Sequence, residues 1–184
     1  MTVIGIVGLP GSGKSEAAAV ARDLDIPVVT MGDVVRAETA DRGLDPASDH
    51  GEVAQALREE DGPDAIATRS LPIIESHLED HDVVVVDGIR SGAEVERFEA
   101  AFGADFRLVE ITAPRQLRRE RLETRGRDTP AAEGGEDLEA REERELGFGM
   151  SAAMEHADIT IENTDSLEAF REEVRTLLQE ARKG

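Results

Sequence analysis

The chain has 184 residues, of which 41 are acidic and 21 basic, and its formal net charge is −20. This length fits one domain of ordinary size, and the lack of cysteine excludes disulfides, thiolate metal sites and cysteine nucleophiles. The acidic balance argues against binding to nucleic acid or to anionic membranes, because both need basic surfaces. No apolar run reaches the ~20 residues of a membrane span, and the first residues lack the basic segment of a signal peptide. We therefore expect a cytoplasmic protein, suited to a salt-rich cytoplasm that screens its charge.

Predicted strands and helices alternate along the chain. Residues 2–8 form a β-branched run that ends in glycine, which is typical of a buried strand, and the four valines within 82–87 predict a central parallel strand. Pro72 should kink or restart the helix that contains it. The other predicted strands cover residues 26–29, 105–112 and 158–162. The predicted helices cover residues 14–24, 30–41, 52–60, 64–79, 91–101, 114–125, 137–146 and 165–182. This order predicts a single α/β domain over residues 1–184, with a parallel sheet covered by helices.

A glycine-rich loop lies between the first predicted strand and the first predicted helix. It has the pattern G-x-x-x-x-G-K-S of a Walker A phosphate-binding loop. Gly11 and Gly13 let the backbone curl around a phosphate, and the helix N-terminus adds positive potential. Lys14 should reach the β- and γ-phosphates of ATP, and the hydroxyl of Ser15 should bind Mg²⁺. The residues expected to contact the nucleotide are Gly8, Leu9, Pro10, Gly11, Ser12, Gly13, Lys14 and Ser15.

Asp87 follows the valine-rich strand at its carboxyl end. Ligands of open α/β sheets bind at the carboxyl ends of the strands, so Asp87 should lie beside the glycine-rich loop. It is therefore the second expected Mg²⁺ ligand, of the Walker B type. The alternative is a turn residue, because Asp-Gly is also a turn dipeptide.

Four segments resemble the nucleoside monophosphate kinases and the related dephospho-CoA kinases. They are GLPGSGKS (8–15), TMGDVVR (30–36), DGIRS (87–91) and RLETRGR (121–127). The chain is also similar to an archaeal group of adenylate-kinase-related P-loop proteins, whose haloarchaeal members are acidic. The resemblance implies a three-layer P-loop NTPase fold with a five-stranded parallel sheet of order 2-3-1-4-5. It further implies a helical acceptor-binding insertion over 30–80 and a mobile lid over 121–140 that closes over ATP.

Several arginines fit this resemblance. Arg36 and Arg90 would bind an acceptor phosphate through both guanidinium nitrogens. Arg121 and Arg125 lie on one face of a predicted helix that leads into the Gly- and Pro-rich segment 126–136, and they would stabilise the transferring phosphoryl group. Arg141 and Arg144 could contribute from the far side of the lid. We assign the remaining arginines of the helix, Arg115, Arg118 and Arg119, to a solvated face.

Other residues allow two interpretations each. Asn163 would pack against adenine according to the resemblance, but it could equally belong to a turn in which Thr164 or Asp165 caps the last helix. Asp33 is either a helix cap or, if the acceptor is a hydroxyl, the base that takes its proton. Segment 37–81 departs from adenylate kinase. Two arginines within it, Arg58 and Arg69, are expected either to bind the acceptor or to form surface ion pairs. The four histidines of the chain show no metal-ligand spacing.

Two functions remain open at the sequence level. The first is a Mg²⁺-dependent kinase that moves the γ-phosphoryl group of ATP to a nucleoside monophosphate, dephospho-CoA or a similar small acceptor. The second is an ATP-hydrolysing switch that acts through a protein partner. The lid arginines favour the kinase, because a switch does not need a closed, dry site.

Overall fold

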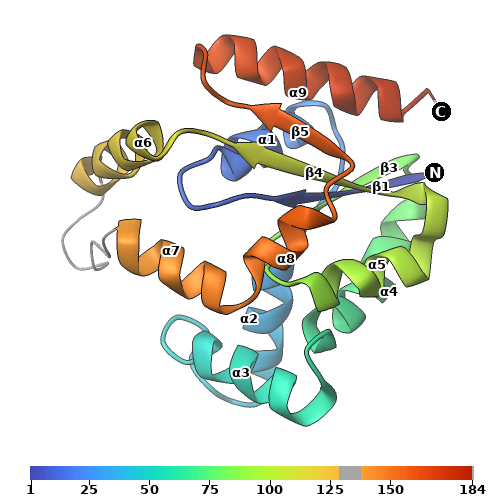
Figure 1. Ribbon diagram of the computed structural model, residues 1–184. Helices are drawn as coiled ribbons and strands as arrows, with labels where there is room; N and C mark the ends of the chain where they lie inside the picture. The colour runs from blue at the N-terminus through green and yellow to red at the C-terminus, as the bar shows by residue number, and fades with distance from the viewer. Residues whose placement is uncertain (129–137, 184) are drawn as a thin grey trace.

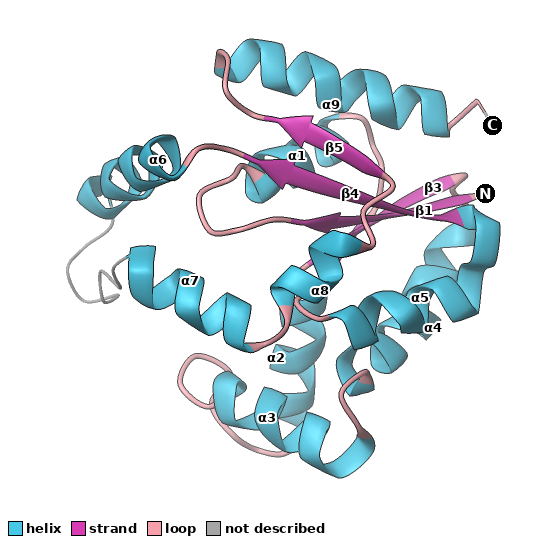
Figure 2. Cartoon of the chain, in the orientation of Figure 1, coloured by secondary structure: helices cyan, strands magenta, loops and turns pink. Residues whose placement is uncertain are grey.

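The computed structural model describes residues 1–128 and 138–183. The strands form one five-stranded parallel sheet, which lies at the centre of the molecule (Figures 1 and 2). The strands are β1 (Thr2–Val7), β2 (Val28–Thr30), β3 (Val83–Asp87), β4 (Phe106–Thr112) and β5 (Ile159–Glu162). The helices are α1 (Lys14–Asp23), α2 (Met31–Asp41), α3 (His50–Asp61), α4 (Ala65–Leu78), α5 (Gly92–Phe102), α6 (Arg115–Asp128), α7 (Leu138–Gly147), α8 (Met150–Glu155) and α9 (Leu167–Ala181), with a short 3₁₀ turn at Gly103–Asp105. The chain therefore alternates strands and helices as its sequence predicts.

The strand order is β2-β3-β1-β4-β5, and all neighbouring strands are parallel. The predicted order 2-3-1-4-5 is thus confirmed. Ile6 of β1 and Thr30 of β2 both lie opposite Asp87 of β3. The carboxyl ends of these three strands therefore meet at one edge of the sheet, and the chain leaves that edge toward α1, α2 and α5.

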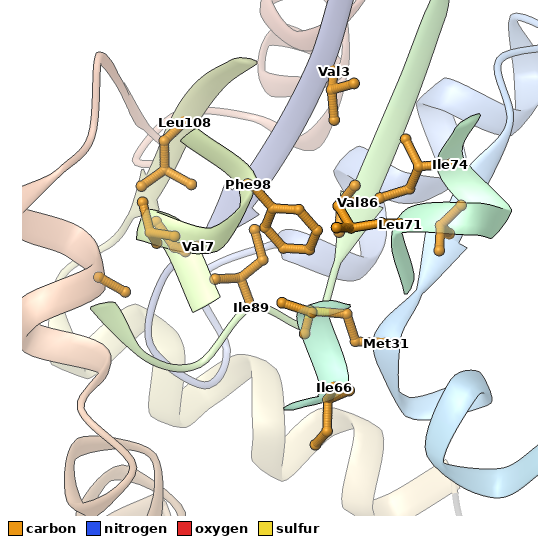
Figure 3. Close-up of a cluster of buried hydrophobic side chains, with 14 of the residues drawn as sticks. Val3, Val7, Met31, Ile66, Leu71, Ile74, Val86, Ile89, Phe98 and Leu108 are labelled. Atoms are coloured by element: carbon orange, nitrogen blue, oxygen red, sulfur yellow. The ribbon is translucent and has the colours of Figure 1, made fainter. Parts of the chain in front are cut away.

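Two clusters of buried side chains fill the two faces of the sheet. On one face, Val84 and Val86 pack with residues of α4 and α5, and the ring of Phe98 occupies the middle of this cluster (Figure 3). On the other face, Val83 and Val85 pack with α1 and α9. The alternation of the β3 valines between the clusters explains why all four are apolar, since a central parallel strand has no solvent-exposed face.

Two features differ from the sequence predictions, and a third predicted feature falls mostly on residues that the structure does not describe. Helix α4 runs through Pro72 without restarting. Helix α8 was not predicted, because six residues give too short a periodic pattern; Met150 and Ala153 are its buried positions. Most of the segment 126–136, expected to be a mobile part of the lid, lies outside the described residues. None of the described helices combines the length and apolar character needed to cross a membrane.

Candidate functional site

The glycine-rich loop, residues 8–15, joins β1 to α1 (Figure 1). The backbone φ angle is +79° at Gly11 and +123° at Gly13, a region that residues with side chains rarely adopt. A Cβ atom on Gly11 would lie 2.7 Å from the carbonyl oxygen of Arg118, and one on Gly13 would lie 2.4 Å from Nδ2 of Asn163. Both positions therefore require glycine, for backbone conformation and for close packing.

Lys14 begins α1, and its side chain folds back over the loop. Its Nζ donates hydrogen bonds to the carbonyl oxygen of Gly8 and, at 3.3 Å, to that of Leu9. A carboxylate oxygen of Glu145, from α7, lies 3.8 Å from the same nitrogen. Burial lowers the pKa of Lys14, while the negative charges of Glu145 and Asp87 oppose this shift. Since charges interact more strongly away from water, this ammonium group is suited to hold an anion.

Asp87 and Ser15 line one cavity together with Lys14. Burial raises the pKa of Asp87, and the charge of Lys14 and the N–H group of Gly88 oppose the rise. Within residues 1–128 and 138–183, no group of three or more His, Cys, Asp or Glu side chains could hold a metal ion. One carboxylate and one hydroxyl still fit Mg²⁺, because this ion usually takes one or two protein ligands and completes its shell with phosphate oxygens and water.

Arg121 and Asn163 were predicted as site residues, and the structure brings them together at the backbone of the loop. Nη2 of Arg121 donates to the backbone and side-chain oxygens of Asn163 at 2.9 and 3.2 Å. Its Nη1 lies 3.4 and 3.3 Å from the carbonyl oxygens of Gly11 and Ser12. Nδ2 of Asn163 also donates to Ser12, at 2.8 Å. These contacts tie α6 and the end of β5 to the loop.

The alternative role for this segment, a helix cap at Thr164 or Asp165, was wrong. Ser166 is the N-cap of α9, and its hydroxyl accepts a hydrogen bond from the N–H group of Ala169 at 3.1 Å. Asn163 itself is buried.

Arg118 was assigned to a solvated face, and that prediction was wrong. Its side chain is buried, and it donates to the carbonyl oxygens of Ala113 at 3.0 Å and Pro10 at 3.2 Å. It also forms an ion pair with Glu142 of α7. Sequence periodicity missed this because burial here comes from the packing of α6 against the loop. Arg115 and Arg119 are exposed as expected, and the side chain of Arg125 lies outside the described part of the chain.

A cavity of about 800 Å³ extends from Lys14 to residues of α2, α3 and α7. Arg36 and Arg90, the predicted acceptor-side cations, both line it, as does Arg58. Arg69 instead forms an ion pair with Asp61 at 2.8 Å, which fits the surface-pair alternative. The cavity thus joins the glycine-rich loop to arginines of α2, α3 and the β3–α5 loop.

The ratio of basic to acidic residues that line this cavity differs from the ratio in the whole sequence. Five cationic side chains line it, namely Lys14, Arg36, Arg58, Arg90 and Arg144. Four acidic side chains line it, namely Glu59, Asp87, Glu94 and Glu145. In the whole sequence, by contrast, acidic residues outnumber basic residues 41 to 21. A local excess of cations in so acidic a chain indicates a site for anions.

Asp33 is not the helix cap that was one of its two expected roles. Thr30, not Asp33, occupies the N-cap position of α2. The side chain of Asp33 is 69% exposed and accepts a hydrogen bond from Nη2 of Arg36 at 2.5 Å. Asp33 is also not among the residues that line the cavity, whereas its partner Arg36 is.

Glu94 is a site residue that sequence reasoning missed. Its carboxylate is completely buried and accepts hydrogen bonds from the backbone N–H of Arg90 at 2.8 Å and from Arg58 at 3.4 Å. Burial raises the pKa of Glu94, against the effects of these two donors. The guanidinium of Arg58 also lies 5.3 Å from the ring centroid of Phe148. The pattern Ser91-x-x-Glu94, a helix-capping signature, was the one available signal for Glu94.

Comparison with known proteins identifies the family. A family model described as an AAA domain matches residues 7–136. A UPF0200 protein of Halobacterium salinarum is 62% identical over 178 residues, which cover 97% of this chain and 93% of that protein. The chain belongs to the UPF0200 family. Another relative, a UPF0200/UPF0201 protein of Archaeoglobus fulgidus, is 52% identical over the whole of this chain, which corresponds to 57% of that longer protein.

Solved structures place this UPF0200 chain among P-loop kinase-like folds. TT1252 from Thermus thermophilus has a TM-score of 0.65 at 20% identity and covers 97% of both chains. Dephospho-CoA kinase from Campylobacter jejuni has a TM-score of 0.57 at 17% identity, covering 100% of this chain and 98% of that one. Shikimate kinase from Acinetobacter baumannii, in complex with shikimate, has a TM-score of 0.55 at 18% identity, covering 97% and 92%. The resemblance found in the sequence is thus confirmed at the level of the fold.

Proposed function

We propose that this protein is a Mg²⁺-dependent phosphotransferase, which moves the γ-phosphoryl group of ATP to a small anionic acceptor such as a nucleotide. One observation carries the proposal: a single cavity is lined by the phosphate-loop residues Lys14 and Ser15 and by the arginines of the α2–α3 segment and the β3–α5 loop. A phosphoryl donor and an acceptor must meet in one space, because the transfer is an in-line displacement. Two of the structural neighbours are named as kinases, which supports the reaction class.

On the donor side, the loop amides and Lys14 would bind the β- and γ-phosphates. Ser15 and Asp87 would hold Mg²⁺, which supplies charge neutralisation on the phosphate oxygens. Arg121 would fix the loop through its contacts with Gly11 and Ser12 and would, with Arg125, approach the transferring group when residues 121–140 close as a lid.

On the acceptor side, residues 30–80 would form the binding insertion. Arg36 and Arg90 would bind the acceptor anion, and Arg58 would join them. Phosphoryl transfer depends mostly on positioning and on electrostatic stabilisation, for which three guanidinium groups around one space are suited. The poor placement of Asp33 as a base favours an acceptor phosphate over an acceptor hydroxyl.

The test is a coupled assay of ADP release in KCl with MgATP and, in separate reactions, AMP, CMP, UMP, dephospho-CoA, shikimate or no acceptor. We expect one acceptor class to raise the rate well above the basal rate. Slow hydrolysis that no acceptor stimulates would favour the ATP-hydrolysing switch instead. Turnover that survives in Lys14→Ala would show that the site is wrong.

A further inference from the structure

Helix α7 faces the phosphate loop with two carboxylates that are three residues apart. Glu142 forms an ion pair with Arg118, which itself donates to Pro10 of the loop. Glu145, one turn further along the same helix, lies 3.8 Å from Nζ of Lys14. Residues three apart share a helix face, so α7 is held against the loop at two points.

The contact between Glu145 and Lys14 is largely shielded from water. The side chains of Glu145 and Lys14 are only 13% and 18% exposed. Oε2 of Glu145 is buried and accepts no hydrogen bond from the described residues. A buried carboxylate oxygen without a hydrogen-bond donor is costly, and the nearby ammonium offsets that cost only in part. The contacts of Glu145 therefore do not fully compensate the cost of burying its carboxylate.

We propose that Glu145 is a positioning residue for Lys14. The carboxylate of Glu145 serves as the counter-ion of the Lys14 ammonium group, and Lys14 leaves this carboxylate when it binds the triphosphate. The inference rests on the proposed function in one respect, namely that ATP binds the loop. Lys14 is the cation that a Walker A loop directs at the β- and γ-phosphates. The carboxylate would then face phosphate oxygens at short range, and like charges at that distance repel. Glu145 and the triphosphate thus compete for one cation.

The same stretch of chain also reaches the acceptor side of the cavity. Phe148, three residues after Glu145, lies against the guanidinium of Arg58, which is hydrogen-bonded to Glu94. Arg144 lines the cavity beside Glu145. Phe148 directly follows α7, so one short stretch of chain contacts both Lys14 and Arg58.

The experiment is isothermal titration of the full-length protein with a non-hydrolysable ATP analogue and Mg²⁺. Glu145→Gln removes the competing charge and keeps the shape, so we expect this variant to bind the analogue roughly tenfold more tightly than the wild type. Glu145→Asp keeps the charge and should bind within about twofold of the wild type. Glu143→Gln is the matched control, because Glu143 is exposed on the same helix and its loss changes the net charge equally.

The direction of the change separates positioning from a purely structural role. A structural role predicts weaker binding by Glu145→Gln, since a damaged site loses affinity. Equal or weaker binding by this variant, in a series where the wild type binds the analogue, overturns the inference and leaves the proposed function standing. Absence of binding by the wild type and by all variants overturns both.

Discussion

Lys14 carries a positive charge that an arginine could not replace. Only two of the 21 basic residues are lysines, Lys14 and Lys183. The ammonium of Lys14 lies between the carbonyl oxygens of Gly8 and Leu9, in a space that a planar, forked guanidinium does not match. We expect Lys14→Arg to lower kcat/KM for MgATP by about 100-fold or more in the ADP-release assay. Lys183→Arg, an exchange of the same kind at an exposed residue, should leave kcat/KM unchanged; a similar loss in both variants would contradict the argument.

Glu94 should make the stability of the protein depend on pH. Because burial raises its pKa, the folded protein keeps a proton on Glu94 at pH values where the unfolded chain has lost it. The free energy of unfolding therefore falls as pH rises from the ordinary glutamate pKa toward the folded value. Glu94→Gln cannot titrate, yet its amide oxygen can still accept the N–H group of Arg90. We expect urea titrations across this pH range to give a shallower fall for the variant.

A residual slope should remain in Glu94→Gln, since burial also raises the pKa of Asp87. Glu96→Gln, on the exposed face of the same helix, serves as the control and should keep the full slope of the wild type. Equal slopes for the wild type and Glu94→Gln would mean that Glu94 is ionised in the folded protein throughout this range.

At the scale of single elements, α6 is anchored to the phosphate loop through Arg118. Arg118→Met keeps the length of the side chain but leaves the carbonyl oxygens of Ala113 and Pro10 and the carboxylate of Glu142 without this donor. Loss of a buried charged partner typically costs ~2–4 kcal/mol of unfolding free energy. Urea denaturation should show a loss in this range. Arg119→Met, at an exposed neighbouring position, should change the unfolding free energy by less than ~0.5 kcal/mol.

The elements themselves were largely readable from the sequence, and the reason is local. The valine run of β3 and the glycine pattern of residues 8–15 each carry their own structural signal within a few residues. Arg118 and Glu145 carry no such signal, and the only local signal at Glu94 is the helix-capping pattern that begins at Ser91, which does not indicate a buried site residue. Each is a charged residue on a helix, and its burial arises only when α6, α5 or α7 packs against segments far away in the sequence.

The whole molecule combines an acidic surface with a cavity in which cations prevail. The net charge of −20 makes the folded chain repel itself, because folding brings the carboxylates closer together. Arginines from α2, α3 and the β3–α5 loop line the same cavity as Lys14 although they are far apart in sequence. The strand order brings them together, since β3 lies between β2 and β1 and all three strands end at one edge. The fold therefore gathers basic residues around this cavity, which the acidic composition of the whole sequence does not indicate.

This charge balance predicts that salt stabilises the protein. The Debye length falls from about 10 Å at 0.1 M salt to about 3 Å at 1 M, so repulsion between surface carboxylates is largely screened at high salt. We expect the thermal midpoint to rise when KCl is raised from about 0.1 M to about 2 M, as followed by circular dichroism. A variant with Glu168, Glu173 and Glu180 of α9 changed to Gln, all of them exposed, should gain less from the same salt. A midpoint that falls with KCl, or an equal gain in the variant, would show that surface repulsion does not limit the stability of this chain.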